Sequence, residues 1–151
     1  QRYGYSYQEA KNVDDSYTQS RGHGFGKEAK RRIMIGTHVL SSGYYDAYYK
    51  QAQTVRTKLI QEFEEAFRQV DFLIGPVAPT TAFKIGQNIQ DPLQMYLADV
   101  MTVAPNLAGN PAISLPAGES QGLPVNLHIM APQKADRDLL AFAKQAEGVL
   151  A

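Results

Sequence analysis

Residues 106–132 constrain the fold of this chain most strongly, because glycines and prolines divide them into short apolar segments. Two prolines bracket the first apolar run, 112–115, and a second run covers 123–130. Glycine readily adopts a positive φ or allows a close backbone approach, so we expect one of these at Gly109 and a turn over 118–122. The segment therefore predicts two short strands joined by a polar turn, inside an α/β layer.

Helical periodicity marks several other parts of the chain. Apolar and small residues recur at intervals of three and four, which predicts helices over residues 26–40, 45–70 and 135–150. In residues 1–24 glycines break any such period, and we expect turns around one short helix near 13–19. The helix over 45–70 has the clearest pattern, and Ser41 or Ser42 is expected to cap its start. At about seven turns it needs a large partner surface, for which we expect a sheet.

The middle of the chain predicts one more strand and one more helix. Residues 72–74 form a short apolar run of the kind that suits a central parallel strand. The proline-containing loop 76–81 follows and cannot be regular. Asp91 and Pro92 are typical of an N-cap and a first helical position, which predicts a helix that ends near residue 100. Helices interleaved with short strands indicate an α/β fold with a mixed sheet flanked by helices.

Composition narrows the classes of function. The 151 residues suit one domain, and 15 basic and 15 acidic residues give no net charge that would attract nucleic acid or an anionic membrane. The absence of cysteine excludes disulfides, thiolate metal sites and a cysteine nucleophile. The histidines are too scattered for a metal site, and no apolar run approaches the ~20 residues of a membrane span. We expect a cytoplasmic protein.

Positive charge is concentrated at one place, the start of the helix predicted over 26–40. The cluster comprises Lys27, Lys30, Arg31 and Arg32. It could bind a phosphate, form an ion-paired helix face or hold a substrate. Arg32 lies at the border of the apolar stripe, about 60° from Ala29, whereas Arg31 falls opposite the stripe. Arg32 can therefore reach an internal cleft and hold a carboxylate through two parallel hydrogen bonds. Glu28 is spaced to pair with Arg32.

Other polar residues are open to two interpretations. Asp99 projects away from the apolar side of its predicted helix, so the helix alone makes it a solvated carboxylate. His38 and His128 are expected to be packed histidines rather than catalytic bases. A Ser/Lys catalytic system is conceivable, but no spacing supports it; its candidate residues are Ser41, Ser42, Ser114 and Lys50. Four tyrosines could stack on nucleic-acid bases, but a packed helix face explains them better; they are Tyr44, Tyr45, Tyr48 and Tyr49.

The Gly/Pro-rich segment, together with residues 75–83 and 40–50, resembles the carboxyl-terminal part of the amidase signature family. The likeness runs from about residue 2 to residue 150 and is closest to the branch formed by the A subunits of bacterial glutamyl-tRNA(Gln) amidotransferases. Residues 24–50 are the most particular to that branch. Three positions depart from the family pattern: Asn110, His38 and His128.

The resemblance implies the carboxyl-terminal part of a single amidase domain over 1–151. The family uses a catalytic lysine and two serines, and the serines lie in and after a Gly/Ser-rich signature. No such signature occurs here, so we expect no catalytic residue in this chain. The chain also opens on Gln1. We therefore expect an inactive fragment of a longer protein.

For the intact protein, the resemblance implies hydrolysis of glutamine to supply ammonia for converting Glu-tRNA(Gln) to Gln-tRNA(Gln). It assigns the α-carboxylate of glutamine to Arg32 and the α-amino group to Asp99. No cofactor or metal is implied in this chain. The implied partners are a B subunit, which binds tRNA and uses ATP and Mg²⁺, and a small C subunit, with no membrane involved.

Two alternatives remain at this point. The first is another amidase-signature hydrolase that acts on small amides. Such an enzyme binds no zwitterionic substrate, so a requirement for Arg32 and Asp99 would distinguish a glutamine-binding enzyme from it. A non-catalytic interaction or RNA-binding module is the second alternative. Neutral charge and the lack of interleaved aromatic and basic residues argue against RNA binding.

Overall fold

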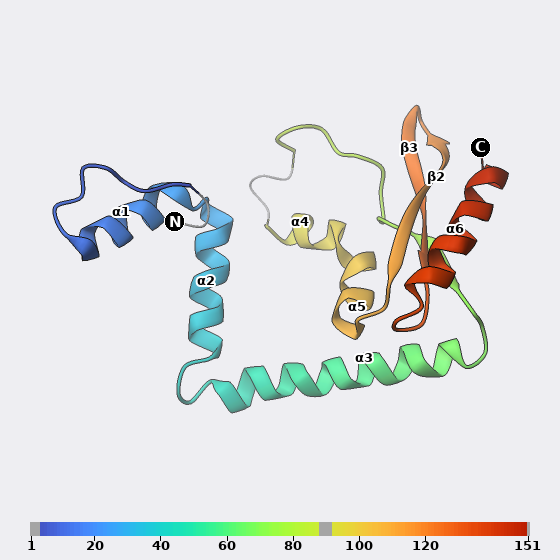
Figure 1. The fold of residues 1–151 in the computed structure, drawn as a ribbon, viewed down its shortest axis with the longest axis horizontal. Helices are drawn as coiled ribbons and strands as arrows, with labels where there is room; N and C mark the ends of the chain where they lie inside the picture. Colours follow the sequence, from blue (N-terminus) through green and yellow to red (C-terminus); the bar gives the residue numbers. More distant parts are fainter. Residues whose placement is uncertain (1–3, 88–91, 151) are drawn as a thin grey trace. The chain divides into compact units, whose positions relative to one another are not determined.

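The computed structural model describes residues 4–87 and 92–150, and the chain divides into two compact units, Gln1–Ala52 and Gln53–Ala151. Each unit is described by itself. The elements, in chain order, are α1 (Val13–Gly24), α2 (Lys27–Val39), the π-helix η1 (Tyr45–Lys50), α3 (Gln51–Phe67), β1 (Leu73–Pro76), α4 (Pro92–Ala98), α5 (Val100–Ala108), β2 (Ala112–Ser120), β3 (Leu123–Met130) and α6 (Asp136–Leu150) (Figure 1).

Helix α1 starts at a polar cap. The Asn12 side chain accepts the Asp15 N–H at 2.8 Å, which satisfies one of the backbone donors exposed at a helix start. The Asp15 carboxylate accepts the Lys11 N–H and then the Gln19 side chain, and these bonds lower the pKa of Asp15. The predicted helix near 13–19 is confirmed and extends further than expected.

Helix α2 confirms the helix predicted over 26–40, but the serine after it has a different role from the one expected. The Ser41 hydroxyl donates to the His38 carbonyl at 2.6 Å, so it binds the end of α2. The next helical segment, η1, begins after Tyr44 without a side-chain cap. The predicted serine cap is wrong because the last turn of α2 presents unpaired carbonyls within reach of Ser41.

The long helix predicted over 45–70 forms as η1 followed by α3. Its expected partner is wrong: within the described chain α3 has no buried residue, and α6 covers the sheet (Figure 1). The Arg56 side chain instead donates through Nε to the Leu107 carbonyl at the end of α5, at 2.7 Å. Helix α3 thus contacts the segments that lead into the sheet rather than the sheet face.

Strands β2 and β3 form the hairpin that the Gly/Pro-rich segment predicts. They pair antiparallel, with a register irregularity between Pro116 and Glu119. The turn is tighter than the predicted 118–122, because the chain reverses at Gln121 and Gly122, with φ of 54° and 74°. Positive φ at two successive residues matches the twist of the flanking strands.

Strand β1 occupies an end of the sheet, whose order is β1-β3-β2. It pairs antiparallel with β3, Leu73 opposite Met130, so the prediction of a central parallel strand is wrong. Residues along β1 alternate between half-buried and exposed, and Ile74 is 53% exposed. A three-residue apolar run cannot specify how many neighbours a strand has. The helix-flanked sheet of the predicted α/β class is confirmed, and its three described strands are antiparallel throughout.

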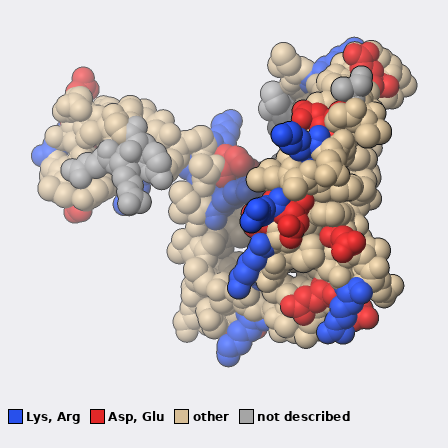
Figure 2. Space-filling model, turned by 45° about the vertical axis from the view of Figure 1, so that its right-hand side comes forward, with Lys and Arg blue, Asp and Glu red and all other residues tan. Residues whose placement is uncertain are grey.

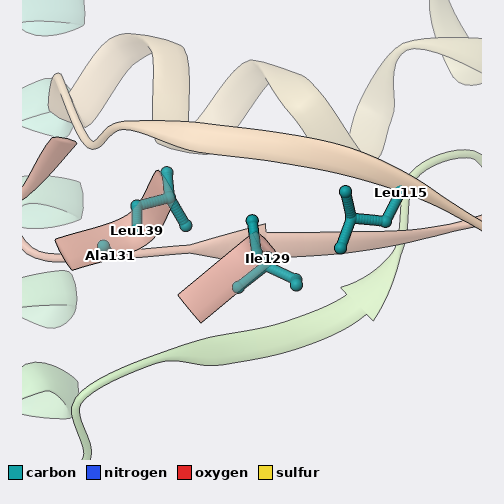
Figure 3. Close-up of a cluster of buried hydrophobic side chains, with 5 residues drawn as sticks. Leu115, Ile129, Ala131 and Leu139 are labelled. Carbon is teal, nitrogen blue, oxygen red and sulfur yellow. The ribbon is translucent and has the colours of Figure 1, made fainter. Parts of the chain in front are cut away.

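The core of the second unit lies between the hairpin and α6. Leu127 and Ile129 of β3 lie on the same face of the strand, as its two-residue period requires, and pack in the cluster with α6, where Ile129 is fully buried. Phe72 and Phe142 stack beside this cluster with ring centroids 4.3 Å apart. The buried apolar residues around Ile129 are Leu115, Ala131, Leu139 and Ala143 (Figure 3).

The segment before the hairpin contains two helices where one was expected. Helix α4 ends before Asp99, and α5 then continues to Ala108 despite Pro105 within it. Gly109 ends α5 with φ 79°, which confirms the positive φ predicted there. The N-cap predicted at Asp91 lies outside the described residues.

Candidate functional site

Arg32 lies on α2 and is bound to its own helix. Its Nε donates to Glu28 Oε1 at 2.9 Å, which confirms the predicted pair, and Arg31 Nη1 lies 3.4 Å from Glu28 Oε2. The Arg32 side chain is 65% exposed and that of Arg31 is 39% exposed. The apolar stripe predicted that Arg32 would be the more enclosed of the two arginines, but Arg32 is the more exposed. The stripe itself is open, since α2 has no buried residue in the described chain.

Asp99 lies between α4 and α5, where it is the N-cap residue of α5. Its side chain is exposed, as its position on the predicted helix indicates, and makes no capping hydrogen bond in the described structure. Its carbonyl instead accepts the Thr102 N–H at 3.0 Å. Asp99 belongs to the second unit and Arg32 to the first, so each is described within its own unit.

A cavity of about 640 Å³ lies between the loop after β1 and the tip of the hairpin, and Asp99 is not among the described residues that line it. Ala98, the residue before Asp99, lines it. A smaller cavity of about 330 Å³ shares Ala98 and residues 79–83, so Thr80 and Thr81 line both. The sequence predicted this loop to be irregular but gave it no function. Two adjacent threonines in a proline-containing loop after a strand are the signal that could have marked it.

Another cavity of about 390 Å³ lies between α3 and the loops at the other end of the strands. Asn110 lines it, and its Nδ2 donates to the Ala131 carbonyl at 3.0 Å. Gln133 Nε2 donates to the Ala108 carbonyl at 2.6 Å. These two amides join the segment at the end of α5 to the segment between β3 and α6. The Asn110 Oδ1 atom is buried without a hydrogen-bond partner, at a position where the sequence departs from the family pattern.

The two histidines expected to be packed differ in their surroundings. His128 on β3 is 4% exposed, and burial lowers its pKa, so the prediction is confirmed there. His38 is exposed, with its ring centroid 4.2 Å from that of Tyr44. The prediction is wrong for His38, because no residue of α2 is buried in the described part of its own unit.

The tyrosines of η1 stack on one another. Tyr45 and Tyr49 have ring centroids 4.9 Å apart, and Tyr44 and Tyr48 lie 6.0 Å apart. Tyr44, Tyr45 and Tyr48 are exposed, so the predicted packing beneath a neighbour is wrong within this unit. Lys50 Nζ pairs with an Asp46 carboxylate oxygen at 2.6 Å, which is an ion pair along η1 rather than part of a Ser/Lys system.

Other kinds of site are not found in the described part of the chain. Its histidines, aspartates and glutamates form no group that could hold a metal ion. None of its helices combines the length and the apolar character needed to cross a membrane. Lys and Arg side chains are interspersed with Asp and Glu over the face in Figure 2, so no large field of one sign covers that face.

Similar known proteins include glutamyl-tRNA(Gln) amidotransferase A subunits from two bacteria. That of Streptococcus pneumoniae is 51% identical over 146 residues, which is 97% of this chain and 30% of the relative. That of Geobacillus thermodenitrificans is 59% identical over 129 residues, 85% of this chain and 27% of the relative. The chain thus spans less than a third of the length of these relatives.

Solved structures agree in fold. One match is the crystal structure of the glutamyl-tRNA(Gln) amidotransferase A subunit from Thermotoga maritima. It has a TM-score of 0.61 and 46% identity, and the match covers 83% of this chain and 28% of that one. A crystal structure of an amidase, 23% identical, matches with a TM-score of 0.69 over 91% of this chain and 32% of that one, which supports the fold alone. The family model described as Amidase matches residues 1–140, and the chain therefore belongs to the amidase family.

Proposed function

We propose that this chain is part of the A subunit of a glutamyl-tRNA(Gln) amidotransferase, which hydrolyses glutamine and supplies ammonia for converting Glu-tRNA(Gln) to Gln-tRNA(Gln). The observation that carries the proposal is the 51% identity over 146 residues to the Streptococcus pneumoniae protein. The fold similarity to the Thermotoga maritima protein supports it. Family membership alone would be compatible with many amide substrates.

Within this proposal, Arg32 binds the α-carboxylate of glutamine and Asp99 binds the α-ammonium group. A zwitterionic amino acid needs one fixed cation and one fixed anion around its Cα. The planar guanidinium of arginine suits a carboxylate because it donates two parallel hydrogen bonds. The exposure of both side chains leaves them accessible to solute.

The remaining catalytic parts are proposed to lie outside this chain. A serine nucleophile, a second serine and a lysine would come from the longer protein, so the 151-residue chain alone has no glutaminase activity. B and C subunits would complete the complex, with tRNA and ATP·Mg²⁺ bound mainly by the B subunit. Its place of action would be the cytoplasm.

The test is glutaminase activity of the full-length protein with its partner subunits, wild type against Arg32→Ala. We expect kcat/KM to fall by about tenfold or more, which is at least ~1.4 kcal/mol of transition-state binding. Arg31→Ala is the matched control, because Arg31 contacts the same Glu28 but has no role in the proposed clamp. We expect kcat/KM to change less than about twofold in that variant.

The result also separates the alternatives. An unchanged kcat/KM in Arg32→Ala, with preference for an apolar amide over glutamine, would replace the proposal with a hydrolase of small amides. Salt-sensitive tRNA binding by the 151-residue chain alone would support an RNA-binding module instead. Ammonia release from glutamine by that chain would contradict the proposed inactivity.

A further inference from the structure

The cavity of about 390 Å³ beside α3 lies within the second unit, and neither Arg32 nor Asp99 is among the described residues that line it. Its volume falls in the range of cavities that hold small molecules, roughly 300–1,000 Å³. One stripe of α3 forms an apolar wall, in which Ile60, Phe63 and Phe67 are half-buried. The rings of Phe63 and Phe67 stack with centroids 6.2 Å apart. This wall can contact an apolar group of a ligand.

Two amide side chains in the lining are oriented by backbone carbonyls. Asn110 Nδ2 donates to the Ala131 carbonyl at 3.0 Å, and Gln133 Nε2 donates to the Ala108 carbonyl at 2.6 Å. An amide held through its nitrogen still has its oxygen as an acceptor. The Asn110 Oδ1 atom is buried without a partner in the described structure, which costs free energy. The lining therefore favours a ligand that donates hydrogen bonds.

The charged side chains of the lining favour a cation. Glu64 and Arg68 are both exposed at the cavity. Arg68 Nη1 lies 2.8 Å from Glu65 Oε2, so a neighbouring carboxylate offsets its charge. The Glu64 carboxylate makes no ion pair or hydrogen bond with another residue of the described chain. It is therefore available to a ligand and attracts a positive charge.

We propose that this cavity binds a small primary amine, with Glu64 pairing with its ammonium group and Phe63 and Phe67 contacting its apolar stem. An ammonium group has three donors and no acceptor, which matches a lining that presents a carboxylate and amide oxygens. Aromatic rings also attract a cation that lies over their faces. The inference involves other residues than the proposed glutamine clamp and does not depend on the proposed function.

The first experiment tests the ligand class with three probes of the same chain length. In the full-length protein with its partner subunits, titrations followed by saturation-transfer NMR give the Kd of hexylamine, hexanol and hexanoate. We expect hexylamine to bind about tenfold more tightly than the other two. Equal binding of hexylamine and hexanol would overturn the inference, because the apolar wall alone would then explain binding. Tighter binding of hexanoate would also overturn it, since the cavity would then select an anion.

The second experiment tests the role of Glu64. Glu64→Gln keeps the side-chain shape, and we expect it to weaken hexylamine binding about tenfold while the Kd of hexanol stays within about twofold of wild type. Retained hexanol binding shows that the apolar wall is still folded. Glu62→Gln is the matched control, because Glu62 is an exposed carboxylate on the same helix and is not among the described lining residues. The control should keep the wild-type Kd of hexylamine, and an unchanged Kd in Glu64→Gln would overturn the inference.

Added glutamine separates this inference from the proposed function. Saturating glutamine should leave the Kd of hexylamine within about twofold, because the proposed clamp residues do not line this cavity. Displacement of hexylamine by glutamine would overturn the inference, since the amine would then occupy the glutamine site. If the wild-type complex does not hydrolyse glutamine, the proposed function is overturned, and the amine site is decided by the two titrations alone.

Discussion

Helix α6 buries Leu139 and Ala143 against the hairpin, whereas α2, of similar length, has no buried residue in the described chain. Both helices carry apolar residues at helical spacing, and both were predicted from the same signal. The second unit provides a sheet face for its stripe, while Ile33 of α2 is 53% exposed. Amphipathic periodicity therefore specifies a helix and a face, but a partner must exist before that face is buried.

The largest test of this contrast truncates one isoleucine in each unit. Ile129→Ala should destabilise the 151-residue chain by about 2–5 kcal/mol, because it removes a fully buried side chain and leaves a cavity. Ile33→Ala is the matched control and should change stability by no more than about 0.5 kcal/mol. Urea denaturation followed by circular dichroism measures both. Equal losses would mean that the two units are packed alike.

A pair of glycine substitutions should act in opposite directions. Gly109→Ala places a Cβ at φ 79° and should cost about 1–2 kcal/mol, although the new atom would make only an ordinary contact with Gln133. Gly36→Ala lies in α2 with open space around it and should stabilise by about 0.5–1 kcal/mol. Thermal unfolding of both variants checks this. A stabilising effect of Gly109→Ala would contradict the backbone argument.

The buried His128 and the exposed His38 allow the two units to be compared by the pH dependence of stability. Burial lowers the pKa of His128 below its ordinary value of 6.5, so below that pH the unfolded chain binds the proton more readily than the folded chain. The stability contribution of neutral His128 is present above pH 6.5 and is lost as pH falls toward the folded-state pKa. Denaturant unfolding across pH should show a weaker acid loss in His128→Gln than in wild type.

The exposed His38 provides the control for that measurement. His38→Gln should keep the wild-type loss of stability on acidification. An unchanged pH dependence in His128→Gln would show that His128 does not cause the loss.

The smallest effect is expected at the ion pairs of α2. Glu28→Gln removes the carboxylate that contacts both Arg31 and Arg32, yet all three side chains are substantially exposed. Exposed pairs at this spacing contribute little, so stability should change by no more than about 0.5 kcal/mol. Differential scanning calorimetry can test this, and a loss above about 1 kcal/mol would indicate that α2 is more enclosed than the described unit.

Much of the local structure was predictable, and the errors share one cause. The helices over 26–40 and 135–150, the hairpin and the positive φ at Gly109 all follow from short-range preferences. The errors concern which elements contact one another. They are the position of β1 at an end of the sheet, the partner of α3 and the surroundings of His38. Helix α5 was missed because proline normally interrupts a helix, although the structure contains Pro105 within one.

The candidate site was only partly accessible to sequence reasoning. Helical geometry marked Arg32 as able to reach a cleft, and the family resemblance then assigned both Arg32 and Asp99 to the substrate. Asp99 has no support from helical periodicity. The cavity between the loop after β1 and the tip of the hairpin was not predicted, because its lining combines Thr81 with Asn126, which are distant in sequence. Its uncharged character becomes visible only when those segments lie together.

By itself, the sequence determined where the backbone turns and where it coils, because the conformational freedom of Gly109 and Gly122 and the capping by Asn12 act over a few residues. Only the tertiary structure decided that β1 lies at an end of the sheet, that α6 covers the hairpin and that an uncharged cavity forms between the loop after β1 and the tip of the hairpin. Burial and cavity lining depend on which distant segments meet, and hydrophobic contact is non-directional, so a local pattern cannot name its partner.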